Sequence, residues 1–183
     1  MAIKTMSSSG GGDWSIGWKE VTLKDAKYGK YNDTRYIDAW FEEYPETINL
    51  RLYEARSKDG EEFAIARLFK LANAGIVGEV QDSAGRKSIQ YDDDSNNLNG
   101  RKLQVFFYKN EDGYFRVLNR VAPVPQDGDV LSFSDDDASY WKKQAEKYYD
   151  QYKKPAESNG EMLEMTTDEI KETVTASTDD VPF

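Results

Sequence analysis

Aromatic rings and cationic side chains alternate along several stretches of this chain. Flat rings can stack on unpaired bases for about 1 to 3 kcal/mol each, while cations neutralise phosphates and release counterions. A single-stranded nucleic acid needs both kinds of group on one surface. The candidate nucleic-acid contacts are Lys27, Tyr28, Lys30, Tyr31, Arg35, Tyr36, Trp40, Arg51, Tyr53, Lys102, Phe106, Tyr108 and Arg116. The competing interpretation is that many of these rings fill the hydrophobic core or cover its rim.

The absence of two residue types limits the catalytic mechanisms and metal sites that this chain can form. The 183 residues include no cysteine and no histidine, which excludes disulfides, thiol chemistry, catalytic triads and most transition-metal sites. Aspartate runs at residues 92–94 and 135–137 could bind Mg²⁺ as in a metal-dependent nuclease. Their places in a polar loop and at a helix start favour solvated or capping roles. The sequence therefore predicts a binding protein without enzymatic activity, cofactor or metal.

The net charge of −10 is divided unevenly along the chain. Residues 1–125 carry a net charge of −1, whereas residues 126–183 carry −9. Residues 155–183 contain one lysine, eight acids and few apolar side chains, so they cannot bury enough surface to offset the entropy of ordering. We expect a disordered acidic tail that competes with nucleic acid for the cationic surface at low salt.

The elements that must position the candidate contacts follow from apolar spacing. Alternation with a period of two predicts strands over residues 17–23, 34–44, 47–55, 101–108 and 114–122, with one further short strand allowed near 89–91. Residues 24–33 are predicted to form a turn-rich loop, and residues 61–73 have helical spacing. In the second and third strands, Ile37 and Leu50 belong to the inward sets, while Trp40 and Arg51 point outward.

Five strands with a helix between the third and fourth are the order of an OB-fold, a small Greek-key barrel that commonly binds oligonucleotides. A five-stranded sheet with one packed helix is the competing architecture. We predict a mainly β protein whose parts are a flexible leader (1–13), an OB-fold domain (14–125), a connector with a second helix (126–154) and the acidic tail (155–183). An aromatic stripe on this second helix is expected to pack on the barrel or on its copy in a homodimer.

The chain ends in an unusual peptide made of Asp179, Asp180, Val181, Pro182 and Phe183. A terminal Phe after two acids offers an apolar plug, a carboxylate and negative charge to a partner with a basic-rimmed pocket. The peptide resembles the acidic tip that ends bacterial single-stranded-DNA-binding proteins. One barrel-like domain, a connector and an acidic tail ending in Phe are also similar to the single-stranded-DNA-binding proteins of bacteriophages.

This resemblance is fairly specific over the five terminal residues and is one of pattern only over residues 14–124. The N-terminal strand sequence of the bacterial family is not recognised here, and an aromatic helix replaces that family's Gly/Pro/Gln-rich linker. Both departures favour a divergent phage-type member. The resemblance implies a protein that coats single-stranded DNA in replication, recombination and repair, and that recruits a polymerase, helicase, nuclease or recombinase through its tip.

Two further expectations complete the sequence-based interpretation. No apolar run approaches the ~20 residues that a membrane helix needs, and residues 1–12 lack the apolar stretch of a signal peptide. We therefore expect a cytoplasmic protein, in the host cytoplasm if it is viral, with no membrane partner. The alternative to nucleic-acid binding is an adaptor whose aromatic face binds polypeptide.

Overall fold

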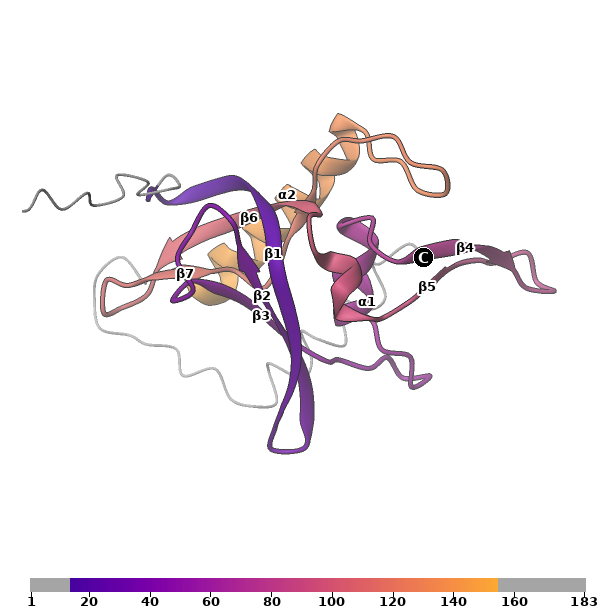
Figure 1. Cartoon of the computed structure of the whole chain (residues 1–183), viewed down its shortest axis with the longest axis horizontal. Helices are drawn as coiled ribbons and strands as arrows, with labels where there is room; N and C mark the ends of the chain where they lie inside the picture. The colour runs from indigo at the N-terminus through magenta and orange to yellow at the C-terminus, as the bar shows by residue number, and fades with distance from the viewer. Residues whose placement is uncertain (1–13, 155–183) are drawn as a thin grey trace, which may run out of the picture.

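The computed structural model describes residues 14–154, so the predicted leader and the acidic tail with its tip lie outside the described residues. Within this range the protein is mainly β, as predicted, with an antiparallel sheet and two α-helices (Figure 1). No helix among residues 14–154 has the length and apolarity needed to cross a membrane.

The main sheet is built around one long strand. Its six strands are β1 (Gly17–Tyr31), β2 (Thr34–Phe41), β3 (Asn49–Tyr53), β6 (Lys102–Lys109), β7 (Phe115–Val117) and β8 (Ala122–Pro123). The first half of β1 pairs with β6 and its second half pairs with β2, both antiparallel. The order β3-β2-β1-β6-β7 leaves β3 and β7 at its two ends, and no hydrogen-bonded pairing of the described strands closes them into a barrel.

The length of β1 corrects the prediction of a loop over residues 24–33. A bulge between Leu23 and Asp25 shifts the pairing with β2 by one residue, and the strand then continues to Tyr31. Leu23 is buried before the bulge and Ala26 after it, so the inward set changes parity and the period-two pattern is broken. The two residues of the following turn, Asn32 and Asp33, both have positive φ, as tight hairpin turns require.

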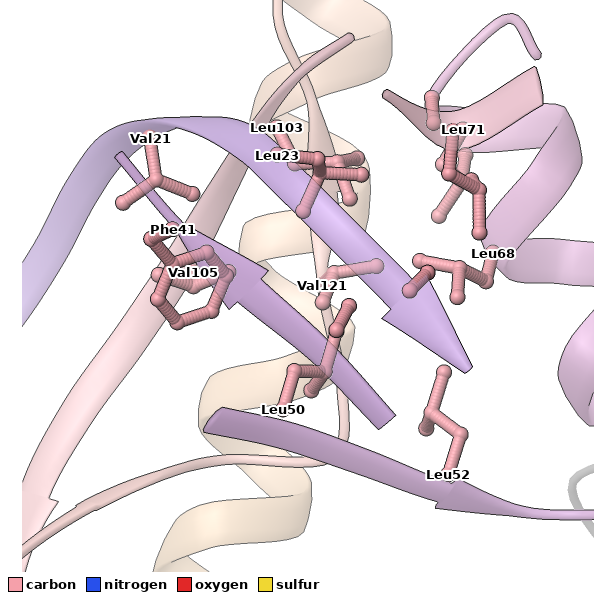
Figure 2. Packing of buried hydrophobic residues seen from close by; sticks show 14 of the residues in the cluster. Val21, Leu23, Phe41, Leu50, Leu52, Leu68, Leu71, Leu103, Val105 and Val121 are labelled. Atoms are coloured by element: carbon pink, nitrogen blue, oxygen red, sulfur yellow. The ribbon is translucent and has the colours of Figure 1, made fainter. Parts of the chain in front are cut away.

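The predicted first helix is confirmed in a shorter form, α1 (Ala64–Leu71). Its apolar side chains Leu68 and Phe69 are buried, and Glu62 caps its start by accepting hydrogen bonds from the backbone N–H groups of residues 65 and 66. Figure 2 shows the side chains of α1 facing those of the sheet strands, and this contact forms the main core.

A hairpin of two strands, β4 (Ile76–Gln81) and β5 (Lys87–Tyr91), follows α1. Only the β5 region was predicted as a strand, because β4 is largely exposed and its apolar pattern is weak. The hairpin projects from the body as an arm (Figure 1). It leads to η1 (Ser95–Leu98), a 3₁₀ turn capped by Asp94. The strand predicted over residues 114–122 is also different, because it is split into β7 and β8.

The second helix, predicted over residues 138–154, is α2 (Asp135–Tyr148), which begins three residues earlier and continues as a π-helical turn, η2 (Tyr149–Lys153). Ser134 and Asp137 form a capping box at its start, which explains the earlier beginning. Trp141 packs against the main core. Tyr148 and Tyr149 pack in a separate small cluster around Phe106 and Leu118. The aromatic stripe therefore packs on the body of its own chain.

Candidate nucleic-acid interface

The outward side of β2 and β3 gathers four of the candidate contacts. In the register of these strands, Tyr36 lies opposite Tyr53, Asp38 opposite Arg51 and Trp40 opposite Asn49. Side chains of directly paired residues share one side of a sheet. We call the six residues Tyr36, Asp38, Trp40, Asn49, Arg51 and Tyr53 the β2–β3 face. The residues between them, including Ile37 and Leu50, are buried on the other side.

A buried carboxylate organises this face. Arg51 donates two hydrogen bonds of 2.7 Å to Asp38, one to each carboxylate oxygen, and Asn49 donates a third of 3.0 Å. Asp38 is only 8% exposed. The hydrogen bond to Asp38 raises the pKa of the Arg51 guanidinium above its ordinary value. The guanidinium is thereby held over the Tyr36 ring, with its carbon 4.1 Å from the ring centre.

Asp38→Ala is expected to lower the free energy of unfolding by about 1 to 3 kcal/mol, because Arg51 and Asn49 lose their shared acceptor. Urea denaturation measures the change. Glu79→Ala is the matched control, since Glu79 pairs with Lys87 in the exposed arm at 3.4 Å. An exposed pair of this kind contributes less than about 1 kcal/mol. Equal effects of the two substitutions would contradict an organising role for Asp38.

The rings of the β2–β3 face are held by close neighbours. Tyr36 packs edge-on against Tyr53 at 5.5 Å between ring centres. It also lies directly over Gly29 of β1, where a Cβ atom would come within 2.4 Å of the ring. Gly29 thus permits a close approach, whereas its sequence context had indicated a turn. Trp40 is half-buried and its indole Nε1 donates to the carbonyl oxygen of Glu46 at 3.2 Å.

Two candidate contacts, Tyr28 and Arg35, lie on the opposite side of the same strands. Tyr28 is paired with Ile37, whose side chain is in the core. The Arg35 guanidinium lies 3.8 Å from the centre of the Tyr28 ring and 3.7 Å from Asp93, and the Tyr28 hydroxyl donates to the carbonyl oxygen of Asp93. Burial raises the pKa of Tyr28 above its ordinary value. These two residues fasten the segment after β5 and are not part of the β2–β3 face.

The remaining contacts on β1 are divided by the same alternation. Lys27 is paired with Asp38 and therefore lies on the side of the β2–β3 face. Tyr31, at the hairpin tip, has the same parity and is 62% exposed. Lys30 is paired with Arg35 on the other side and lies 3.7 Å from Asp33. Lys27 and Tyr31 thus extend the aromatic and cationic surface toward the hairpin tip.

The predicted contacts on β6 and β7 differ from one another in how exposed they are. Phe106 points away from the main core, but it is buried, because Tyr149 of η2 covers it at 4.9 Å between ring centres. This corrects its prediction as an open stacking ring. Tyr108 is half-buried, with Tyr149 at 5.6 Å. Arg116 and Lys102 are exposed.

A groove of about 250 Å³ lies between the turn after β2 and the loop between β6 and β7. We call it the end groove, and its lining residues are Trp14, Thr47, Ile48, Gly113, Tyr114, Phe115 and Arg116. Trp14 is 43% exposed and Tyr114 is 65% exposed, which suits stacking. Neither was predicted as a contact. The exposure of Tyr114 could have been expected from its position next to Gly113 in the predicted hairpin loop. Trp14 lies before the first strand, where nothing in the sequence indicates its neighbours.

The aspartate runs serve as caps in the structure. Asp94 accepts a hydrogen bond from the backbone N–H of Asn96, and Asp137 belongs to the capping box of α2. Within the described part of the chain, no group of three or more acidic side chains is arranged to hold a metal ion.

Comparison with known proteins finds no matching family model, no matching curated protein and no matching solved structure. The arrangement of rings and cations is therefore the basis on which a function can be inferred.

Proposed function

We propose that this chain is a non-enzymatic single-stranded-DNA-binding protein that coats and protects DNA with little sequence preference. The observation that carries the proposal is the β2–β3 face, where three rings and the Arg51 guanidinium share one side of two paired strands. Rings at strand spacing can stack on successive bases, while Arg51 and Lys27 neutralise phosphates. Because every base has a flat π-surface, such stacking tolerates any sequence.

The strand order supports an OB-type barrel as the scaffold. In that fold the first strand pairs with both the second and the fourth, and the fifth returns toward the third. Here β1 pairs with β2 and β6, and Cα atoms of β7 come within 8 Å of those of β3. On this assignment the β4–β5 arm is an insertion after the helix. The side that binds oligonucleotides in OB-folds corresponds to the β2–β3 face.

The end groove would extend the path of the DNA strand. Trp40 reaches the turn after β2 through its hydrogen bond to Glu46, and the next residues of that turn, Thr47 and Ile48, line the groove. A bound DNA strand that continues beyond Trp40 would therefore meet the exposed rings of Trp14 and Tyr114 next. Its phosphates would lie within reach of Arg116, which also lines the groove.

Recruitment of replication or repair enzymes is the second part of the proposal. It is carried by the peptide Asp179 to Phe183, which lies outside the described residues. An apolar side chain next to two acids would be recognised by an apolar pocket with a basic rim.

A fluorescence titration of the full chain tests the function. Adding a dT oligonucleotide should quench tryptophan emission as Trp40 stacks, and the affinity should fall steeply as salt rises, because phosphate contacts release counterions. RNA and duplex DNA of equal length give the preference between nucleic acids. No salt-dependent binding of dT in dilute buffer would overturn the proposal and favour a polypeptide-binding adaptor.

A further inference from the structure

Several rings and cations lie in the interface between α2 and the body of the protein. Only two side chains of α2 are fully buried, and both are alanines. Beside the packing of Ala145 on Phe106 and Leu118, several contacts reach the body through aromatic or polar atoms: Tyr149 against Phe106 and Tyr108, Tyr148 against Arg120, Trp141 against Arg67, and Glu146 accepting from the Trp18 indole at 2.8 Å. A helix held in this way buries little of the aliphatic surface that fastens most helices.

Two arginines beneath α2 have no acidic partner. Within residues 14–154, neither Arg67 nor Arg120 has a carboxylate within 4 Å. The Nε and Nη2 atoms of Arg67 are buried without a hydrogen-bond acceptor. Burial and then the charge of Arg120 lower the pKa of Arg67 to about 10. Buried guanidinium donors without acceptors are costly, so an anion placed there would be favoured.

The composition beneath α2 matches that of the β2–β3 face. On the open face, the Arg51 guanidinium lies 4.1 Å from the Tyr36 ring. Beneath α2, the Arg120 guanidinium lies 4.2 Å from the ring of Tyr148. In the second case the helix supplies the ring. A base could stack where Tyr148 or Tyr149 now lies, and its phosphate could accept from Arg120.

This surface also continues the proposed path of the DNA strand. Arg116 lines the end groove and is paired with Tyr108 across β6 and β7, so the two side chains lie on the same side of the sheet. Phe106 is two residues before Tyr108 on that side. A bound DNA strand that passes Arg116 would therefore arrive at the edge of α2.

We propose that α2 covers a second surface for the same DNA strand, and that the strand displaces the C-terminal half of the helix to reach it. The covered surface consists of Trp18, Phe106, Tyr108 and Arg120. The N-terminal half stays attached, because Phe133 and Trp141 pack in the main core. The inference rests on the proposed function. It adds that a short DNA strand occupies the β2–β3 face alone, while a longer DNA strand also releases the C-terminal half of α2.

Hydrogen exchange of the full chain tests this directly. A dT strand of about 5 nucleotides should leave exchange of residues 142–153 unchanged, whereas one of about 20 nucleotides should accelerate it about tenfold. Long-strand binding that leaves this exchange unchanged or slows it would overturn the inference and leave the proposed function standing. If neither strand binds, both fail.

Two variants with a matched control separate the covered surface from the open face. Tyr149→Ala should loosen α2 and raise the affinity for the long strand about three- to tenfold, because less free energy is spent on displacement. Arg120→Gln should lower the long-strand affinity about tenfold through loss of a phosphate contact. Both should leave the short-strand affinity unchanged. Gln144→Ala, at an exposed position of α2, should change neither.

Equal effects of Arg120→Gln on short and long strands would overturn the inference. Where Tyr149→Ala fails to fold, as judged by circular dichroism, the exchange measurement on the unmodified chain decides the outcome.

Discussion

Trp40→Ala is expected to weaken binding of a dT oligonucleotide by about 1 to 3 kcal/mol, or roughly 5- to 150-fold in Kd. The indole lies on the β2–β3 face beside the turn that leads into the end groove. Its removal would take away a stacking ring in the middle of the path. Fluorescence anisotropy of a labelled oligonucleotide measures the change without relying on the tryptophan signal.

The control for this prediction is Trp40→Phe, which keeps a flat ring but loses the indole N–H and the second ring of the indole. We expect it to recover most of the affinity, because stacking requires a flat ring and not a hydrogen-bond donor. Loss of the bond to Glu46 should cost only about 0.5 to 1.5 kcal/mol of stability. If Trp40→Ala unfolds the protein, or binds as tightly as the unmodified chain, the ring has a role in packing and not in binding.

Phe107→Ala should produce the largest loss of stability, about 3 to 5 kcal/mol in the free energy of unfolding. Phe107 is fully buried on β6, with its ring centre 4.6 Å from that of Tyr44 and 6.5 Å from that of Phe115. The cavity left by the ring would lie at the junction of three elements. Domains of this size have a total stability of about 5 to 15 kcal/mol, so the variant would lose a large part of its stability.

Urea denaturation followed by circular dichroism measures this loss, and Phe106→Ala provides the comparison. Phe106 is the next residue on the same strand, but it faces α2 and keeps 9% of its surface exposed. Its removal should cost less, because α2 can settle into the space. A larger loss for Phe106 than for Phe107 would show that the small cluster under α2, and not the main core, dominates stability.

The β2–β3 face could be predicted from the sequence because each of its strands has one side in the core. Ile37, Ala39 and Leu50 alternate strictly with polar or aromatic residues, and this fixes the register. The same reasoning failed for Tyr28 and Arg35. Arg35 was grouped with the face by composition, although the alternation from Ile37 assigns it to the other side. Tyr28 falls in the predicted loop, and its side follows only from its pairing with Ile37 across β1 and β2.

Other features depend on contacts between distant parts of the chain. The bulge after Leu23 has no recognisable signal in the local sequence. Because it interrupts the period-two alternation, the second half of β1 was not predicted as a strand. Strand β4 of the arm was not predicted, because its side chains do not alternate between buried and exposed positions. Val77 and Val80 are both exposed, at 67% and 42%. Burial of Phe106 depends on a helix some 40 residues later in the chain, which strand periodicity alone does not reveal.

The sharing of β1 between two partners has a consequence for how the molecule assembles. The hairpin of β1 and β2 closes between Tyr31 and Thr34, which are three positions apart, whereas the pairing of β1 with β6 joins residues 80 to 90 positions apart. Closing the longer loop costs more chain entropy and is slower. During synthesis, the three-stranded meander would leave the ribosome complete but without the partner that covers its inner side. Productive folding would then wait for the arrival of β6, and chaperones would be needed most in that interval.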